Sequence, residues 1–122
     1  FKAKFVRLPR LLKRLGAAHL VDKQFEKELN ELKRVDLLIL DDWGIGQMDA
    51  IARTDLLEVI EDRCGTGSTI ITSVLPIETW GQYIGDPTLA DSILDRVITN
   101  AHHINIEGPS MRDLKKYGAV KD

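Results

Sequence analysis

A mostly apolar run that ends in two acidic residues constrains this sequence more than any other feature. Residues Val35–Leu40 form the run, and Asp41 and Asp42 follow it directly. Apolarity sustained over that length predicts a strand buried on both faces, as in a parallel sheet. Ligands of open α/β sheets bind beyond the carboxyl ends of the strands, where one carboxylate can hold Mg²⁺ and a second can orient an attacking water. An Asp-rich turn after the strand explains the same two residues equally well.

Strand and helix patterns alternate along the rest of the chain, whose 122 residues suit one domain. Asp49 and Asp86 stand where they can cap helices. This alternation predicts the α/β class, with a mostly parallel sheet flanked by helices. The predicted helices cover residues 8–20, 23–34, 50–63, 76–83 and 87–99, and the predicted strands cover 1–6, 35–42, 68–73 and 103–107.

Hydroxyl side chains end the strand predicted over residues 68–73, which we also expect to be buried. Thr72 and Ser73 are the last residues of that strand. Their hydroxyls would lie beside the acidic pair and contact a phosphate or the attacking water. Alternatively, each hydroxyl bonds the backbone of its own turn.

An arginine on the polar face of the predicted helix 87–99 has two interpretations. Arg96 would either reach a phosphate bound by a neighbouring subunit, or pair locally, for example with Asp95. Helical spacing does not decide between the two roles. The same choice applies to Arg63 and Arg112.

The first 20 residues carry six basic side chains and no acidic one, which leaves 11 basic against 19 acidic residues in the rest of the chain. Such a split suggests an anionic partner for the basic segment. We take the basic side chains around the first predicted helix as candidate contacts to double-stranded DNA, because neutralised phosphates dominate nonspecific affinity. A solvated amphipathic helix is the alternative. The candidates are Arg7, Arg10, Lys13 and Arg14.

Composition excludes several classes of protein. The single cysteine, Cys64, cannot form an internal disulfide, and without a signal peptide this predicts a cytoplasmic protein. No apolar run approaches the roughly 20 residues that span a bilayer, so we expect no membrane partner. None of the nine glycines is followed by lysine, so the sequence lacks the Gly-x-x-x-x-Gly-Lys-Ser/Thr loop that cradles phosphates.

From residue 35 onward the sequence resembles the IstB family, the ATP-binding helpers of insertion-sequence transposition, which are similar to the DnaC helicase loaders among AAA+ ATPases. Residues 1–34 match more loosely. The resemblance implies a partial P-loop NTPase core, and we expect a fragment whose missing phosphate-loop strand belongs between the strands 68–73 and 103–107. The matching stretches are Asp36–Gly44, Asp55–Arg63, Ser68–Ser73, Trp80, Asp86–Arg96 and Gly108–Arg112.

The resemblance also implies roles for individual residues. Asp41 takes the position of the Walker B residue that holds Mg²⁺, and Asp42 takes the place where many AAA+ proteins have a catalytic Glu. Ser73, with Thr72 beside it, falls at the sensor 1 position. Arg96 falls at the position of the arginine finger, which acts across a subunit boundary.

The whole protein implied by the resemblance is an ATPase that uses ATP and Mg²⁺, assembles on DNA, self-associates through the ATP interface, and recruits or activates a transposase. Arg112, in the terminal motif, would sense phosphate. A DnaC-like loader of a replicative helicase is the close alternative, and a receiver-like signalling domain or a non-enzymatic module are the alternatives from other classes. Without a phosphate loop, we expect this chain alone neither to hydrolyse ATP nor to bind ATP or Mg²⁺ tightly.

Overall fold

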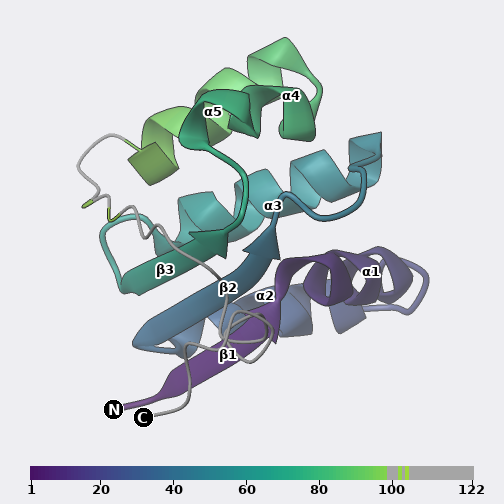
Figure 1. The fold of residues 1–122 in the computed structure, drawn as a ribbon. Helices are drawn as coiled ribbons and strands as arrows, with labels where there is room; N and C mark the ends of the chain where they lie inside the picture. Colours follow the sequence, from purple (N-terminus) through teal and green to yellow (C-terminus); the bar gives the residue numbers. More distant parts are fainter. Residues whose placement is uncertain (99–101, 103, 105–122) are drawn as a thin grey trace, which may run out of the picture.

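A computed structural model describes residues 1–98, 102 and 104 of the chain. Strands and helices alternate along it as the sequence predicts (Figure 1). Of the predicted strand 103–107 the structure describes residue 104 alone, which is exposed, and Arg112 lies outside the described residues. In chain order the elements are β1 (Ala3–Arg7), α1 (Leu8–Ala18), α2 (Gln24–Arg34), β2 (Leu37–Trp43), α3 (Ala50–Arg63), β3 (Ser68–Ser73), the 3-10 turn η1 (Ile77–Thr79), α4 (Trp80–Ile84) and α5 (Pro87–Ile98).

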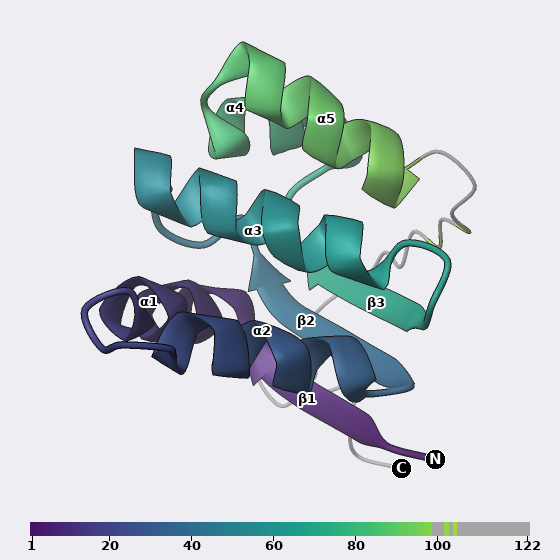
Figure 2. The ribbon, with the colours of Figure 1, turned by 180° about the vertical axis from the view of Figure 1, so that it is seen from behind.

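The three strands form one parallel sheet in the order β1-β2-β3. Each strand is added beside the previous one in chain order. Because the crossovers are right-handed, the connecting helices therefore lie on the same face of the sheet. Figures 1 and 2 show α1, α2 and α3 together on one face, with α4 and α5 packed beyond α3. The predicted α/β class is confirmed, and the arrangement is consistent with part of a P-loop NTPase fold.

One face of the sheet is buried and the other is partly open. Leu38 and Leu40 of β2 face the helices and have no exposed surface. On the other face, Phe5, Ile39 and Ile70 lie in register across the three strands, and Phe5 is 62% exposed. Within the described residues, the prediction that β2 is buried on both faces is therefore wrong for this face, because α1, α2 and α3 cover the opposite one.

The third strand is exposed, although the sequence predicts that it is buried. Ile70 is 46% exposed, and Ser68, Thr69 and Thr72 are exposed as well. Among the described residues, β3 pairs with β2 alone, so its outer edge has no neighbour. That edge position and the uncovered face explain why the prediction of burial is wrong. The further strand expected beside β3 stays a prediction.

The helices begin and pack largely as predicted. Asp49 accepts a hydrogen bond of 2.8 Å from the backbone N–H of Ala52 at the start of α3, and Asp86 accepts one of 3.0 Å from Leu89 in the first turn of α5. Within the described part of the chain, no helix is long and apolar enough to cross a membrane. The apolar face of α1 packs into the core with Leu8, Leu11, Leu12 and Leu15.

A buried arginine holds the amino ends of the strands. Arg63, the last residue of α3, is 3% exposed. Its guanidinium donates to the carbonyl oxygens of Leu32, Val35 and Ser68 over 2.7–2.9 Å, and to the Thr69 hydroxyl over 3.0 Å. Burial lowers the pKa of this arginine from its ordinary value. Arg63 therefore joins the end of α2 to the starts of β2 and β3. Of the two roles that the sequence leaves open for Arg63, a phosphate contact or a local partner, the structure shows the local one.

Candidate functional site

A β-bulge lies where β2 ends. Leu40 pairs with Ile71 and Trp43 pairs with Ser73, so the two residues between them on β2, Asp41 and Asp42, oppose a single residue of β3. Asp42 has a φ of 62°, in the left-handed region that Asp tolerates better than most residues. Bulges of this kind redirect side chains at the ends of sheets. The bulge therefore presents both carboxylates at the carboxyl edge of the sheet.

Each carboxylate of this pair has its own partner on a neighbouring strand. The Thr72 hydroxyl at the end of β3 donates to Oδ1 of Asp41. Arg7 at the end of β1 donates through Nε to Oδ2 of Asp42, over 2.5 Å. All three strands thus contribute a side chain, and the acidic pair lies between a cation on one side and a hydroxyl on the other.

Ser73 is engaged differently from Thr72, although the two residues are adjacent. Its hydroxyl donates to the carbonyl oxygen of Trp43 over 2.5 Å and accepts a 3.0 Å hydrogen bond from the backbone N–H of Leu75. The hydroxyl thus joins the end of β2 to the turn that follows β3. For Ser73 the structure agrees with a hydroxyl that bonds its own turn, and its role at the sensor 1 position stays a prediction.

The donor chemistry at this edge suits Mg²⁺, which prefers oxygen ligands and is usually held by one or two carboxylates together with water and phosphate oxygens. Asp41 and Asp42 supply the carboxylates. In the described residues, no group of three or more His, Cys, Asp or Glu side chains is placed to hold a metal ion. A cation here would therefore take most of its ligands from a phosphate and from water rather than from this part of the chain.

The four basic residues proposed for DNA fall into two groups. Arg7 pairs with Asp42, and Arg14 pairs with Glu28 of α2 over 2.6 Å. The hydrogen bond from Arg14 lowers the pKa of Glu28, and the same bond raises the pKa of Arg14. Arg10 and Lys13 are exposed on α1. The structure therefore keeps the last two available to a partner and gives the first two an internal ion pair.

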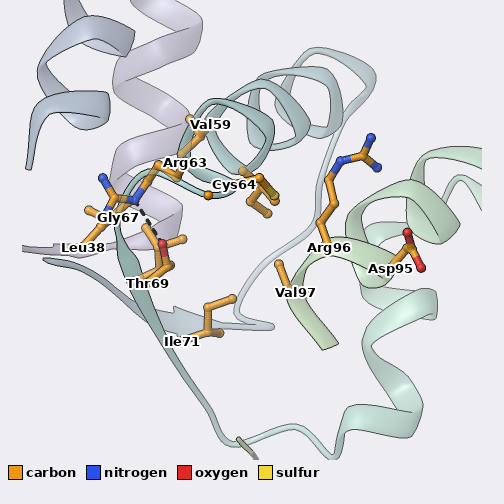
Figure 3. Close-up of a pocket in the computed structure, with 13 residues that line it drawn as sticks. Leu38, Val59, Arg63, Cys64, Gly67, Thr69, Ile71, Asp95, Arg96 and Val97 are labelled. Atoms are coloured by element: carbon orange, nitrogen blue, oxygen red, sulfur yellow. Dashed lines mark hydrogen bonds between the residues drawn. The ribbon is translucent and has the colours of Figure 1, made fainter. Parts of the chain in front are cut away.

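Arg96 lies away from the acidic pair. It lines a pocket of about 580 Å³ between α3, α5 and β3, and neither residue of the pair lines that pocket. Figure 3 shows Arg96 on α5 beside Val97, with Thr69 of β3 elsewhere on the pocket wall. Its guanidinium donates to the carbonyl oxygen of Ser92 and lies 3.6 Å from a carboxylate oxygen of Glu61 in α3. The arginine-finger role, which requires a neighbouring subunit, stays a prediction.

Sequence reasoning missed the contact between Arg7 and Asp42. The sequence groups Arg7 with the basic side chains around the first predicted helix, but Arg7 is the last residue of β1 and lies in register with Asp41. A signal was available, because a parallel sheet brings the last residues of neighbouring strands to one edge. The bulge had no comparable signal, since the sequence does not reveal that two residues of β2 oppose one of β3.

A family model for the IstB-like ATP binding protein matches residues 1–119 of the chain. The chain belongs to the IstB-like ATP-binding protein family. It is 49% identical over 108 residues to the insertion sequence ATP-binding protein y4pL of Sinorhizobium fredii, an alignment that covers 88% of this chain and 44% of the relative.

Other relatives are also described as ATP-binding proteins of insertion sequences. The chain is 52% identical over 79 residues to the ATP-binding protein of insertion sequence IS1162 from Pseudomonas fluorescens, covering 65% of this chain and 34% of the relative. It is 32% identical over 108 residues to the ATP-binding protein of insertion sequence IS21 from Pseudomonas aeruginosa, covering 88% and 40%. The IstB-like chain thus spans less than half the length of these relatives.

Proposed function

We propose that this IstB-like chain supplies the acidic edge of an ATP site in an ATPase that serves an insertion sequence. The observation that carries the proposal is the bulged acidic pair at the carboxyl edge of a parallel sheet, with each carboxylate held by a different strand. The relatives, whose names describe insertion sequence ATP-binding proteins, support the nucleotide and the setting.

Within this site, the two carboxylates have different roles. Asp41 holds the cation, and Mg²⁺ supplies charge neutralisation at the phosphate oxygens when it is bound. Asp42 orients the attacking water and accepts its proton, the role that a carboxylate near a phosphoryl group can perform. Arg7 fixes the position of Asp42 through the 2.5 Å contact. Because Asp is one methylene shorter than Glu, this alignment of Asp42 matters for hydrolysis.

The remaining site residues act from further away in this proposal. Arg96 is paired with Glu61, and both side chains lie near the surface. In this proposal Arg96 leaves Glu61 and reaches the phosphate bound by a neighbouring subunit. Arg112 contacts phosphate from the terminal motif. At the sensor 1 position, Thr72 by contrast contacts Asp41 directly through its hydroxyl, whereas the neighbouring Ser73 hydroxyl is engaged by the backbone of Trp43 and Leu75.

The partners in this proposal are double-stranded DNA and a transposase. Arg10 and Lys13 are exposed basic residues of α1, and their exposure supports a DNA contact. ATP at the subunit interface favours assembly on the DNA, and hydrolysis releases it. The relatives' names favour transposition over the loading of a replicative helicase, because they refer to insertion sequences.

A chimera tests the proposal, because the chain spans less than half of its relatives. The chain replaces the matching segment of y4pL, and ATP binding and hydrolysis are measured with and without Mg²⁺. We expect Asp41→Asn to abolish the Mg²⁺-dependent gain in ATP affinity. We expect Asp42→Asn to retain ATP binding and to lower kcat by about 100-fold or more, the effect of losing a general base.

Asp91→Asn on the exposed side of α5 is the matched control and should leave both measurements unchanged. If the Asp41→Asn chimera keeps its full Mg²⁺ dependence, the proposed cation site is wrong. The chain by itself should show no micromolar ATP binding by calorimetry, and such binding would contradict the expectation drawn from its sequence.

A further inference from the structure

Two adjacent hydroxyls end β3, and the structure uses them for different purposes. Thr72 lies opposite the bulge of β2 and donates to Oδ1 of Asp41. Ser73 has the carbonyl oxygen of Trp43 as its acceptor and the N–H of Leu75 as its donor. Successive residues of a strand point to opposite faces, so only one of two neighbouring side chains can serve a given site directly.

The single hydrogen of each hydroxyl decides which of the two can donate to the acidic pair. A hydroxyl has one hydrogen to donate. Ser73 gives its hydrogen to the main chain, and a rotation toward Asp41 would break that bond and the bond from Leu75 together. Thr72 gives its hydrogen to the carboxylate that the proposed function assigns to the cation. Thr72 is also exposed.

The hydrogen bond from Thr72 fixes the rotation of the Asp41 carboxylate. It engages Oδ1, whereas Oδ2 receives no hydrogen bond from the described residues. A carboxylate held through one oxygen presents the other in a defined direction, and hydrogen bonds to metal-binding carboxylates raise metal affinity in this way. The contact therefore prepares Asp41 to coordinate a cation through Oδ2.

We infer that Thr72 is the positioning residue of β3 for the cation site, while Ser73 stabilises the turn. The inference rests on the proposed function, because it assumes that Asp41 holds the cation. It assigns the two neighbouring positions separately: Thr72 acts on Mg²⁺ through Asp41, and Ser73 acts on the end of the sheet through Trp43 and Leu75.

Mn²⁺ binding to the 122-residue chain tests the inference. Mn²⁺ prefers the same oxygen ligands as Mg²⁺ and broadens the NMR signals of nearby nuclei, so it reports both the place and the affinity of binding. We expect the wild-type chain to bind Mn²⁺ weakly, with broadening centred on Asp41 and Asp42. Thr72→Val, which keeps the side-chain shape, should weaken this binding by about 10-fold or more.

Two variants distinguish positioning from a structural effect. Thr72→Ser keeps the hydroxyl and should restore the affinity to within about 3-fold of wild type, given that the hydrogen bond carries the effect. Ser73→Ala should leave Mn²⁺ affinity unchanged while lowering the melting temperature. The carboxyl carbon shift of Asp41, measured without metal, should move in Thr72→Val and stay unchanged in Ser73→Ala.

The outcomes separate the inference from the function on which it rests. Equal Mn²⁺ affinity in wild type and Thr72→Val would overturn the inference and leave the cation site standing. Loss of affinity in Ser73→Ala at full folding would assign the role to Ser73 and overturn the inference as well. If wild type shows no broadening at the carboxyl edge, the cation site itself is wrong, and the positioning role falls with it.

Discussion

Arg63 and Arg7 lie at opposite ends of the same sheet and are held in opposite ways. Arg63 is buried at the amino ends of β2 and β3, where three carbonyl oxygens and one hydroxyl accept its hydrogen bonds. Arg7 lies at the carboxyl edge with its side chain 53% exposed and bonds a single carboxylate. One guanidinium is buried and donates to neutral acceptors, and the other pairs with a carboxylate beside solvent.

The contrast indicates that the amino ends of the strands contribute to stability, whereas the carboxyl edge holds the candidate site. A buried guanidinium cannot lose one acceptor without leaving polar groups unsatisfied, so the amino ends are fixed. An exposed ion pair contributes little to stability, because water competes for both partners. Removing Arg7 should therefore cost little stability, whereas removing Arg63 should cost much more.

The largest expected effect follows from removing the buried guanidinium. Arg63→Met keeps most of the side-chain volume and leaves the carbonyl oxygens of Leu32, Val35 and Ser68 without their donor. Each buried acceptor left unsatisfied costs about 1–3 kcal/mol, so we expect the free energy of unfolding to fall by at least ~3 kcal/mol. Urea denaturation followed by circular dichroism measures the change.

Arg34→Met on the exposed end of α2 is the control and should change the free energy of unfolding by less than ~0.5 kcal/mol. Arg63→Lys should also destabilise the chain, since an ammonium cannot reach four acceptors arranged for a planar fork. If Arg63→Met and Arg34→Met are equally stable, the amino ends are not held as argued, and the comparison with Arg7 loses its basis.

Replacing the exposed Arg7 should have little effect on stability but a clear effect on activity. Arg7→Gln should change the free energy of unfolding by less than ~1 kcal/mol, as is usual for surface ion pairs. In the y4pL chimera, however, kcat should fall by about 10-fold or more, because Asp42 loses the partner that aligns it. Arg10→Gln on the neighbouring helix is the matched control, and equal kcat values for the two variants would show that the pair has no role in hydrolysis.

Much of the fold could be predicted from the sequence, because local patterns determine it. The apolar spacing of α1 and the caps Asp49 and Asp86 placed three helices within a few residues of their observed bounds. Burial of the strands could not be read in the same way. The run Leu37–Leu40 is equally apolar on both faces, and only the direction of the crossovers determines which face the helices cover.

The candidate site could be predicted in part for a related reason. Asp41 and Thr72 follow from strand ends that share one edge, and their contact is present in the structure. The division between Thr72 and Ser73 depends on the bulge, which is set by the pairing of two distant strands. The sequence groups Arg7 with the helix that begins after it, because the pattern around that residue does not distinguish the end of a strand from the start of a helix.

A third arginine, Arg14, sharpens the comparison, because its ion pair lies between the two extremes. Its side chain is 48% exposed, whereas that of its partner Glu28 is 12% exposed. The hydrogen bond from Arg14 lowers the pKa of Glu28, and a second bond from Gln24 acts in the same direction. A carboxylate with a lowered folded-state pKa contributes stability above its unfolded-state pKa, and that contribution is lost as the pH falls through the folded-state pKa.

The smallest expected effect is a change in how the free energy of unfolding depends on pH. At pH 7, Glu28→Gln should lower the free energy of unfolding by about 1 kcal/mol or less, since Arg14 is half exposed. The difference from wild type should shrink as the pH falls below about 4.3, the ordinary pKa of Glu. Glu58→Gln on the exposed side of α3 is the control variant for this comparison. A Glu28→Gln difference that stays constant from pH 7 to pH 3 would mean that packing, rather than the charge of the pair, joins α1 to α2.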